Sequence, residues 1–357
     1  MDGALLLKEI EMVTDNARIL VIGAGVNGSI CAVGLCPAGF DVTVLARGKR
    51  YEEIRDEGIV IEDPLKNTRS HTEVPVINRL DPEDFYDYIL VVIRKNQVPD
   101  LLPVLAPNRS PNVVFMVNNP SGPGEFTRVL AKERVMLGFV FGAGKRDGSV
   151  IRAIRGSRMP GIGTPFGEID GKITPRLTRL VGILCQAGLK SETSTNISDY
   201  LATHAALVAP LAHLLIQYGC DTYALARSTS DLRLLVDALR ETLDVLRATG
   251  FKIVPSSANM VRIIPRFVLV AALHRLLSTR FAEVGAGWHC SQAPDEMRQL
   301  GIELMALVEK SGLPVPAIRR FFARLKGKTQ PSFCRGEGNE WLRFQRFAHL
   351  FMKCSLA

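Results

Sequence analysis

Three glycines spaced G-x-G-x-x-G, Gly23, Gly25 and Gly28, are the residues of this chain best suited to holding a reactive cofactor. In a strand-to-helix turn the first glycine permits the bend, the second lets the backbone approach a pyrophosphate, and the third lets helix and strand pack closely. The free N–H groups at the start of the helix, around Val26 and Asn27, then face the anion. The spacing predicts a dinucleotide site, and a purely structural glycine turn is the alternative.

A basic turn after the second predicted strand bears on which dinucleotide binds. Sites that prefer NAD usually carry an Asp or Glu there for the ribose 2′-hydroxyl, but the strand ends in Leu45-Ala46. Arg47 follows, with Lys49 and Arg50 close behind, and a guanidinium can hold a 2′-phosphate through two parallel hydrogen bonds. We therefore predict NADP as the cofactor, with Arg47 as its main 2′-phosphate ligand and Lys49 or Arg50 as a helper. A solvated basic turn is the alternative.

Polar residues also end the next two predicted strands. The apolar run 89–93 leads into Arg94 and Lys95, and the run 112–117 leads into a turn that contains Asn119. Because ligands of doubly wound sheets lie at the carboxyl ends of the strands, these residues are expected at one rim. We expect Arg94 or Lys95 to contact cofactor phosphate or ribose, and Asn119 to position the nicotinamide ribose or the substrate. The alternatives are a solvated loop and a turn-forming asparagine.

The elements that must position these residues are read from hydrophobic periodicity. A strand–turn–helix–strand unit is expected at 19–22, 26–35 and 42–45. A hairpin is expected to pair residues 58–62 with 73–77 around a polar turn. Residues 149–154 are expected to pair with 161–168, and a strand is expected at 134–141. Helices are expected at 51–56, 100–105, 174–187, 200–219, 232–249, 259–282 (bent at Pro265), 294–311 and 316–325.

This order predicts an α/β Rossmann-type N-terminal domain followed by an all-α C-terminal domain. Residues 1–16 form an N-terminal extension, 17–193 the cofactor domain, 194–326 the helical domain for substrate and dimerisation, and 327–357 a tail. The tail carries apolar residues at helical spacing, which predicts an amphipathic helix docked on the body or a second subunit, or bound to a membrane surface. These residues are Trp341, Phe344, Phe347, Leu350 and Phe351.

Composition narrows the partners and the compartment. The net charge is +8, but no run of five basic residues occurs, so an anionic cofactor explains the charge better than nucleic acid does. The cysteines are odd in number and no C-x-x-C occurs, which indicates a reducing compartment without structural zinc. The N-terminus does not resemble a signal peptide, and the charge-free stretch 200–219 contains histidines and a proline, so we expect a buried core helix and no membrane span. A cytoplasmic protein is expected.

These motifs together resemble the ketopantoate reductase (2-dehydropantoate 2-reductase) family. The stretch ILVIGAGVNGSICAVGLCPAGFDVTVLARG is similar to that family's N-terminal signature, and the strand ending in Arg94-Lys95-Asn96-Gln97 is similar to one that ends in a cationic cofactor contact. The turn VNNPSG resembles the family's glutamine-asparagine-glycine turn, with Asn119 at the asparagine. The resemblance covers about residues 1–170 and implies a nicotinamide-linked reductase with NADP as cofactor.

The resemblance also defines what this chain lacks. The family carries a lysine on the first long helix of its C-terminal domain, proposed as proton donor to the keto oxygen, and residues 199–219 contain none. His204 is the one titratable group on the opening turns that could replace it, because the usual pKa of histidine lies near neutrality. The family's Thr-Glu pair is loosely matched by Glu283. A core histidine and an ordinary surface carboxylate are the alternatives for His204 and Glu283.

The prediction is therefore an NADPH-dependent reductase of a small 2-keto acid, with His204 as proton donor, Asn119 positioning the substrate and Glu283 bonding a ribose or orienting the donor. The alternatives are a catalytically inactive NADP-binding or sensing protein on the same fold, or an imine- or opine-type dehydrogenase. No H-x-x-x-H or H-E-x-x-H spacing supports a metal enzyme. The helical half could supply a homodimer interface.

Overall fold

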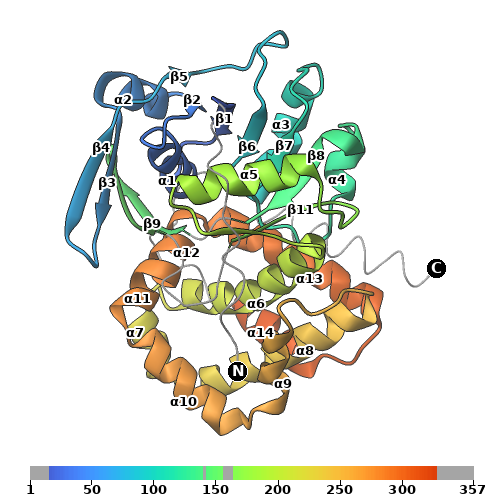
Figure 1. The fold of residues 1–357 in the computed structure, drawn as a ribbon. Helices are drawn as coiled ribbons and strands as arrows, with labels where there is room; N and C mark the ends of the chain where they lie inside the picture. The colour runs from blue at the N-terminus through green and yellow to red at the C-terminus, as the bar shows by residue number, and fades with distance from the viewer. Residues whose placement is uncertain (1–15, 140–141, 156–163, 328–357) are drawn as a thin grey trace, which may run out of the picture.

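A parallel sheet with the strand order of dinucleotide-binding folds forms the centre of the N-terminal domain (Figure 1). The computed structural model describes residues 16–139, 142–155 and 164–327. The strand order is β12-β11-β8-β7-β6-β1-β2-β5. Strands β8, β7, β6, β1, β2 and β5 run parallel to one another, and β11 runs antiparallel to β8. These strands are β1 Arg18–Ile22, β2 Asp41–Leu45, β5 Val76–Ile77, β6 Tyr88–Val91, β7 Val113–Phe115, β8 Val135–Gly138, β11 Thr164–Glu168 and β12 Ser191–Thr193.

Helices cover both faces of this sheet because its central strands are apolar on both sides. One face packs on α1 and α5, and the other packs on α3 and α4 together with the start of α6. Strand order reverses between β1 and β6, which is the topological switch point where ligands bind in such sheets. The helices are α1 Val26–Leu35, α2 Lys49–Glu57, α3 Val98–Leu105, α4 Gly124–Thr127 and α5 Pro175–Gln186.

A second sheet contradicts the predicted hairpin between residues 58–62 and 73–77. Its order is β4-β3-β10-β9, and β3 Ile59–Asp63 pairs antiparallel with β4 Thr68–Thr72. The prediction missed β4 because this strand, TRSHT, is polar and has no buried residue. Residues 76–77 instead join the main sheet beside β2.

The predicted pairing of residues 149–154 with 161–168 is also wrong. Strand β10 Val150–Arg155 pairs antiparallel with β9 Gly142–Asp147 and parallel with β3, whereas β11 pairs with β8. Gly144 of β9 permits close pairing with β10, since a Cβ there would lie 2.1 Å from the Arg152 carbonyl oxygen. Only a glycine fits at that point of the strand.

The second half of the chain is helical, as predicted, around its own core. Gly312, in the left-handed conformation, ends α13 where the sequence predicted a stop. The predicted helix 259–282 is divided into shorter pieces, with the break at Pro265, which has no N–H to continue the ladder. The helices are α6 Ile197–Gln217, α7 Thr222–Ala226, α8 Thr229–Ala248, α9 Met260–Ile263, α10 Arg266–Leu277, α11 Arg280–Ala282, α12 Trp288–Gln292, α13 Pro294–Ser311 and α14 Pro316–Gly327, with a π-helical turn at Glu283–Gly287.

Helix α6 begins inside the N-terminal domain rather than at a clean boundary. Ile197 and Leu201 pack with the sheet, while Ala205 and the residues after it belong to the helical core. By length and composition α6 is the one helix in the described ranges that could cross a membrane, and most of it is buried by its neighbours. The expected N-terminal extension, apart from residue 16, and the expected tail helix lie outside the described residues.

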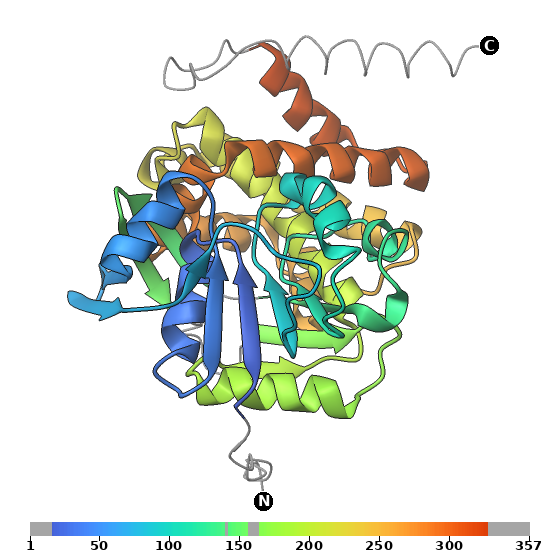
Figure 2. The ribbon, with the colours of Figure 1, turned by 90° about the horizontal axis from the view of Figure 1, so that it is seen from above.

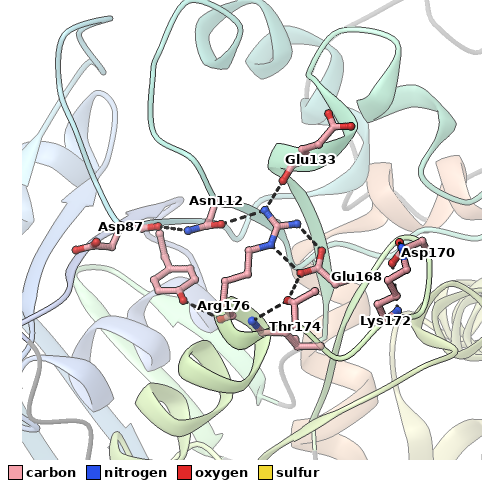
Figure 3. A network of polar contacts seen from close by, with 10 residues as sticks. Asp87, Asn112, Glu133, Glu168, Asp170, Lys172, Thr174 and Arg176 are labelled. Carbon is pink, nitrogen blue, oxygen red and sulfur yellow. Dashed lines mark hydrogen bonds and ion pairs between the residues drawn. The ribbon is translucent and has the colours of Figure 1, made fainter.

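A half-buried arginine network stabilises the edge of the sheet at which β7 and β8 begin (Figure 3). Arg176 of α5 forms an ion pair with Glu168 and donates to the Asn112 side chain at 3.1 Å and to the Glu133 carbonyl oxygen. Thr174 donates to the same Glu168 carboxylate at 2.6 Å. These partners come from α5, β11 and the segments preceding β7 and β8, so the network ties that edge together, while the glycine turn follows the opposite end of β1.

Candidate cofactor and substrate site

The carboxyl ends of the parallel strands face the helical domain. In Figure 2 the arrows of β1 and β2 point toward the long helix α13, which crosses that side of the domain. The glycine turn, the Arg47 turn, Arg94-Lys95 and the Asn119 turn all follow strands at this edge. The expected convergence of these segments is therefore present.

The glycine turn has the geometry that a bound pyrophosphate requires. Gly23 has φ +105°, and a Cβ there would lie 2.3 Å from the Val92 carbonyl oxygen. A Cβ on Gly28 would lie 1.7 Å from the Gly23 carbonyl oxygen, so helix and turn touch at that point. Gly25, at the N-cap of α1, is different, because a Cβ there would have no atom of the described part of the chain within 4 Å. Two glycines thus serve packing, and Gly25 leaves open space before the N–H groups of Val26 and Asn27.

Unpartnered buried amides mark the neighbouring part of the site. Both polar atoms of the Asn119 side-chain amide are buried and have no hydrogen-bond partner among the described residues, and the same holds for Asn27 Oδ1 and Asn118 Oδ1. Asn119 is 1% exposed, so leaving its donor and acceptor unpaired is costly unless a ligand satisfies them. These groups, with the open helix end at Gly25, fit a polar nucleotide, which they could hold through its ribose and amide groups.

The cations of the basic turn differ in whether other residues of the protein already bind them. Arg47 is exposed and pairs with no residue in the described ranges, and Lys49 lies 3.9 Å from Glu53 with its side chain in solvent. Arg50 is buried and donates to the Ala24 carbonyl oxygen at 3.1 Å and to Glu53 at 3.1 Å. Arg50 therefore supports the glycine turn from behind, which argues against its predicted role as a phosphate helper.

Arg94 and Lys95 have protein partners that the sequence did not reveal. Arg94 donates to both carboxylate oxygens of Asp295 in α13, at 2.9 and 3.0 Å, and to the Gln292 carbonyl oxygen. The Lys95 ammonium is buried in an ion pair with Glu125. These partners argue against the predicted phosphate or ribose contacts. Burial acts to raise the pKa of Asp295, but the Asn96 hydrogen bond and the Arg94 charge outweigh it, so that pKa is lowered.

Acidic residues of α13 form hydrogen bonds with the segments that follow β6 and β7. Besides Asp295, the buried Glu296 accepts a hydrogen bond from Asn118 Nδ2 at 3.0 Å, and Ser121 donates to Glu303 at 2.6 Å. The sequence signal was the acidic start of α13 after Pro294, where carboxylates suit the positive end of a helix. Sequence alone could not show that these acids contact the ends of β6 and β7, so Asp295 and Glu296 were missed.

His204 lies at the domain junction, where α6 contacts β8. Its ring packs on Phe139, which follows β8, with centroids 4.3 Å apart, and it stacks on Tyr200 at 6.3 Å. Burial, assisted by the nearby His289, lowers the pKa of His204 to about 4. Burial therefore favours the neutral imidazole, which at pH 7 can donate only its N–H hydrogen.

We expect the lowered pKa of His204 to affect the pH dependence of the unfolding free energy and the NMR titration of the imidazole. The folded protein keeps the ring neutral down to about pH 4, while the unfolded chain protonates near pH 6.5, so stability falls as pH drops through that window. Replacing His204 by leucine should reduce the loss of unfolding free energy between pH 7 and pH 5 by about 1 kcal/mol, since part of the ring is solvated. Burial also lowers the pKa of His213, which contributes to the remaining loss. Imidazole NMR tests this directly: the signal missing from the variant should titrate near pH 4, and a midpoint near 6.5 would refute the assignment.

Glu283 opens the π-helical turn and is held by neighbours in its own domain. Its carboxylate accepts a hydrogen bond from the Tyr223 hydroxyl at 3.2 Å and pairs with Arg280 at 2.5 Å. The turn packs on β9 and β10 through Val284 and Trp288. Glu283 is therefore fixed beside the second sheet, and its predicted contact with a ribose or the donor stays a prediction. Among the described residues no cluster of His, Cys, Asp and Glu suits a metal ion.

The fold and the open glycine turn define a two-domain protein of the Rossmann type with a helical C-terminal domain. The family model described as "Ketopantoate reductase PanE/ApbA" matches residues 19–159. A 2-dehydropantoate 2-reductase of Archaeoglobus fulgidus is 31% identical over 184 residues, which are 50% of this chain and 57% of the relative. Over these residues the N-terminal domain of this chain is similar to that of the ketopantoate reductase family.

Solved structures extend the fold likeness over both domains. A PanE/ApbA family ketopantoate reductase of Ralstonia eutropha matches with a TM-score of 0.66 at 21% identity, over 87% of this chain and 97% of that one. A D-mandelate dehydrogenase solved with NADH and anilino(oxo)acetate matches with a TM-score of 0.69 at 13% identity, over the same shares. At these identities the matches establish the fold, which is that of ketopantoate reductases.

Proposed function

We propose that this protein is an NADPH-dependent reductase of a small 2-keto acid. The observation that carries the proposal is the open N-cap of α1 at Gly25, at the switch point of the sheet. The Asn119 amide, which has no partner among the described residues, follows another strand at the same edge. The family match and the two oxidoreductase relatives support a nicotinamide cofactor. The cofactor, when bound, supplies the hydride.

The chain's own residues would then bind the cofactor and orient the substrate beside it. The helix end at Gly25 would hold the pyrophosphate, Arg47 the 2′-phosphate, and Asn119 the nicotinamide ribose or the substrate. The neutral His204 would donate a hydrogen bond to the developing alkoxide, and solvent water would supply the proton that completes the hydroxyl. Glu283 would contact a ribose or orient the donor. A cytoplasmic location is part of the same proposal.

Arg47 should decide the choice between the two nicotinamide cofactors. We expect Arg47→Ala to lose NADPH affinity by about tenfold or more, because the guanidinium forms a charge-assisted pair with the 2′-phosphate. NADH, which lacks that phosphate, should bind equally to both proteins. Calorimetric titration measures both constants, with Lys49→Ala as the matched cation control, for which a smaller loss is expected. Equal losses for NADPH and NADH would exclude Arg47 as the selector.

The reaction is tested by NADPH oxidation against a panel of 2-keto acids, alone and with amino acids. Turnover with a keto acid alone supports the reductase. Turnover that requires the amino acid would indicate an imine- or opine-type dehydrogenase. Tight NADPH binding without turnover would indicate an inactive binding or sensing protein, an alternative favoured by the absence of lysine from α6 and by the lowered pKa of His204.

A further inference from the structure

Arg50 is a buried cation that binds several separate parts of the protein at once. It is 7% exposed, and it donates from Nε to the Ala24 carbonyl oxygen at 3.1 Å and from Nη1 to Glu53 at 3.1 Å. Nη1 also donates to the Ser149 carbonyl oxygen at 2.9 Å, and Nη2 donates to Ser29 Oγ at 3.4 Å. A guanidinium presents its N–H donors in a rigid planar fork, so these contacts hold the groups that they join in fixed positions.

The Ala24 carbonyl oxygen lies inside the glycine turn, between Gly23 and Gly25. Besides the Arg50 contact it accepts a hydrogen bond from Ser29 Oγ at 3.3 Å, and Ser29 is fully buried. A carbonyl oxygen has two lone pairs, and both are directed here to buried donors. The peptide group that joins Ala24 to Gly25 therefore cannot rotate without breaking both hydrogen bonds and leaving buried donors unpaired.

The orientation of this carbonyl group also sets the orientation of the next N–H group. The Ala24–Gly25 peptide bond is trans, and in a trans peptide the C=O and N–H bonds point in opposite directions. Because the Ala24 oxygen points inward to Arg50, the Gly25 N–H points outward. Gly25 is exposed, and its N–H donates to no residue in the part of the chain that the structure describes. This N–H is thus available to an anion in front of α1, together with those of Val26 and Asn27.

The same guanidinium connects the glycine turn to the second sheet. Ser149 lies in the turn between β9 and β10, 99 positions from Arg50 in the sequence. Glu53 of α2 balances the charge of Arg50, and Arg146 of β9 lies 4.0 Å from the same carboxylate. Because α1, α2 and the β9–β10 turn all meet at Arg50, the second sheet takes part in fixing the glycine turn.

We propose that Arg50 is a positioning residue for the pyrophosphate of the nicotinamide cofactor. By holding the Ala24 carbonyl oxygen, Arg50 keeps the Gly25 N–H pointing to the place where the pyrophosphate binds. The guanidinium is enclosed behind the turn, so it acts through the peptide group and does not contact the cofactor. This inference rests on the proposed function, because it requires the cofactor to bind at the glycine turn.

The test is Arg50→Lys, which keeps the charge but replaces the fork by a single ammonium that cannot reach these acceptors together. NADPH affinity, measured by calorimetry without substrate, should fall by about tenfold. Arg55→Lys is the matched control, because Arg55 of the same helix is exposed and pairs with Asp56, and it should bind NADPH like the wild type. Ser29→Ala removes the other donor to the Ala24 oxygen and should weaken NADPH binding by a smaller factor. Circular dichroism on the same samples checks that each variant is folded.

Adenosine 2′-monophosphate separates positioning of the pyrophosphate from general support of the site. This fragment carries the adenine and the 2′-phosphate but no pyrophosphate, so ligand-observed NMR should show equal affinity for the wild type and Arg50→Lys. An equal loss for NADPH and the fragment would overturn the proposal, because Arg50 would then act through α2 and Arg47. Unchanged NADPH affinity in both Arg50→Lys and Ser29→Ala would overturn it and leave the proposed function intact. A wild-type protein that does not bind NADPH would overturn both.

Discussion

Replacing Gly25 by valine is expected to abolish detectable NADPH binding while the protein stays folded. A Cβ at this position would meet no atom of the described residues within 4 Å, and the backbone φ of −74° suits any residue. It would instead occupy the space in front of the α1 N-terminus, where a pyrophosphate must approach the N–H groups. A loss of at least about 100-fold in affinity, near 3 kcal/mol, is expected.

The measurement is the dissociation constant of NADPH by calorimetry, with the unfolding midpoint recorded on the same samples. Gly124→Val is the matched control, since a Cβ there also has no atom within 4 Å in the ranges that the structure describes but lies at the start of α4. It should bind NADPH like the wild type. Gly28→Ala should differ from both by failing to fold normally, because its Cβ would collide with the Gly23 carbonyl oxygen. Wild-type affinity in Gly25→Val would show that the turn is only structural.

Truncating Glu125 is expected to lower the stability of the protein strongly. The Lys95 ammonium is 4% exposed, lies 5.0 Å from the centroid of the buried Phe126 ring, and has the Glu125 carboxylate as its ion-pair partner. Glu125→Ala leaves this charge buried without a counter-ion, which should cost about 3 kcal/mol of unfolding free energy. Urea denaturation measures the difference.

The double variant Lys95→Met/Glu125→Leu separates the unpaired charge from the lost packing. Replacing both partners by apolar groups should restore most of the stability, because the cost lies in the orphaned ammonium. NADPH affinity of Lys95→Met then distinguishes the two roles of this lysine. The structure predicts wild-type affinity, whereas the role predicted from sequence, as a cofactor ligand, requires a clear loss. A destabilisation below about 1 kcal/mol in Glu125→Ala would mean that solvent reaches the pair.

The sequence predicted well where the signal is local. The glycine spacing, the apolar strands beside it and the capping residues lie within a few positions of one another, so the βαβ unit and the helical second half follow from short-range patterns. Arg47 was found in the same way, by its position just after β2. The second sheet was misread because β4 is polar and β9 rich in glycine, and pairing between distant strands leaves no local trace.

The residues whose roles changed are those whose partners lie far along the chain. Arg94 and Asp295 are 201 positions apart, and the Lys95–Glu125 pair depends on how the turns after β6 and β7 meet. The pKa of His204 depends on burial against Phe139 and on His289, neither of which the α6 sequence contains.

By itself, therefore, the sequence determined the class of fold, the glycine turn and the basic residue that follows β2. Only the tertiary structure decided which cations remain free for a ligand and in which charge state His204 is held, because charge pairing and desolvation act between elements brought together by folding.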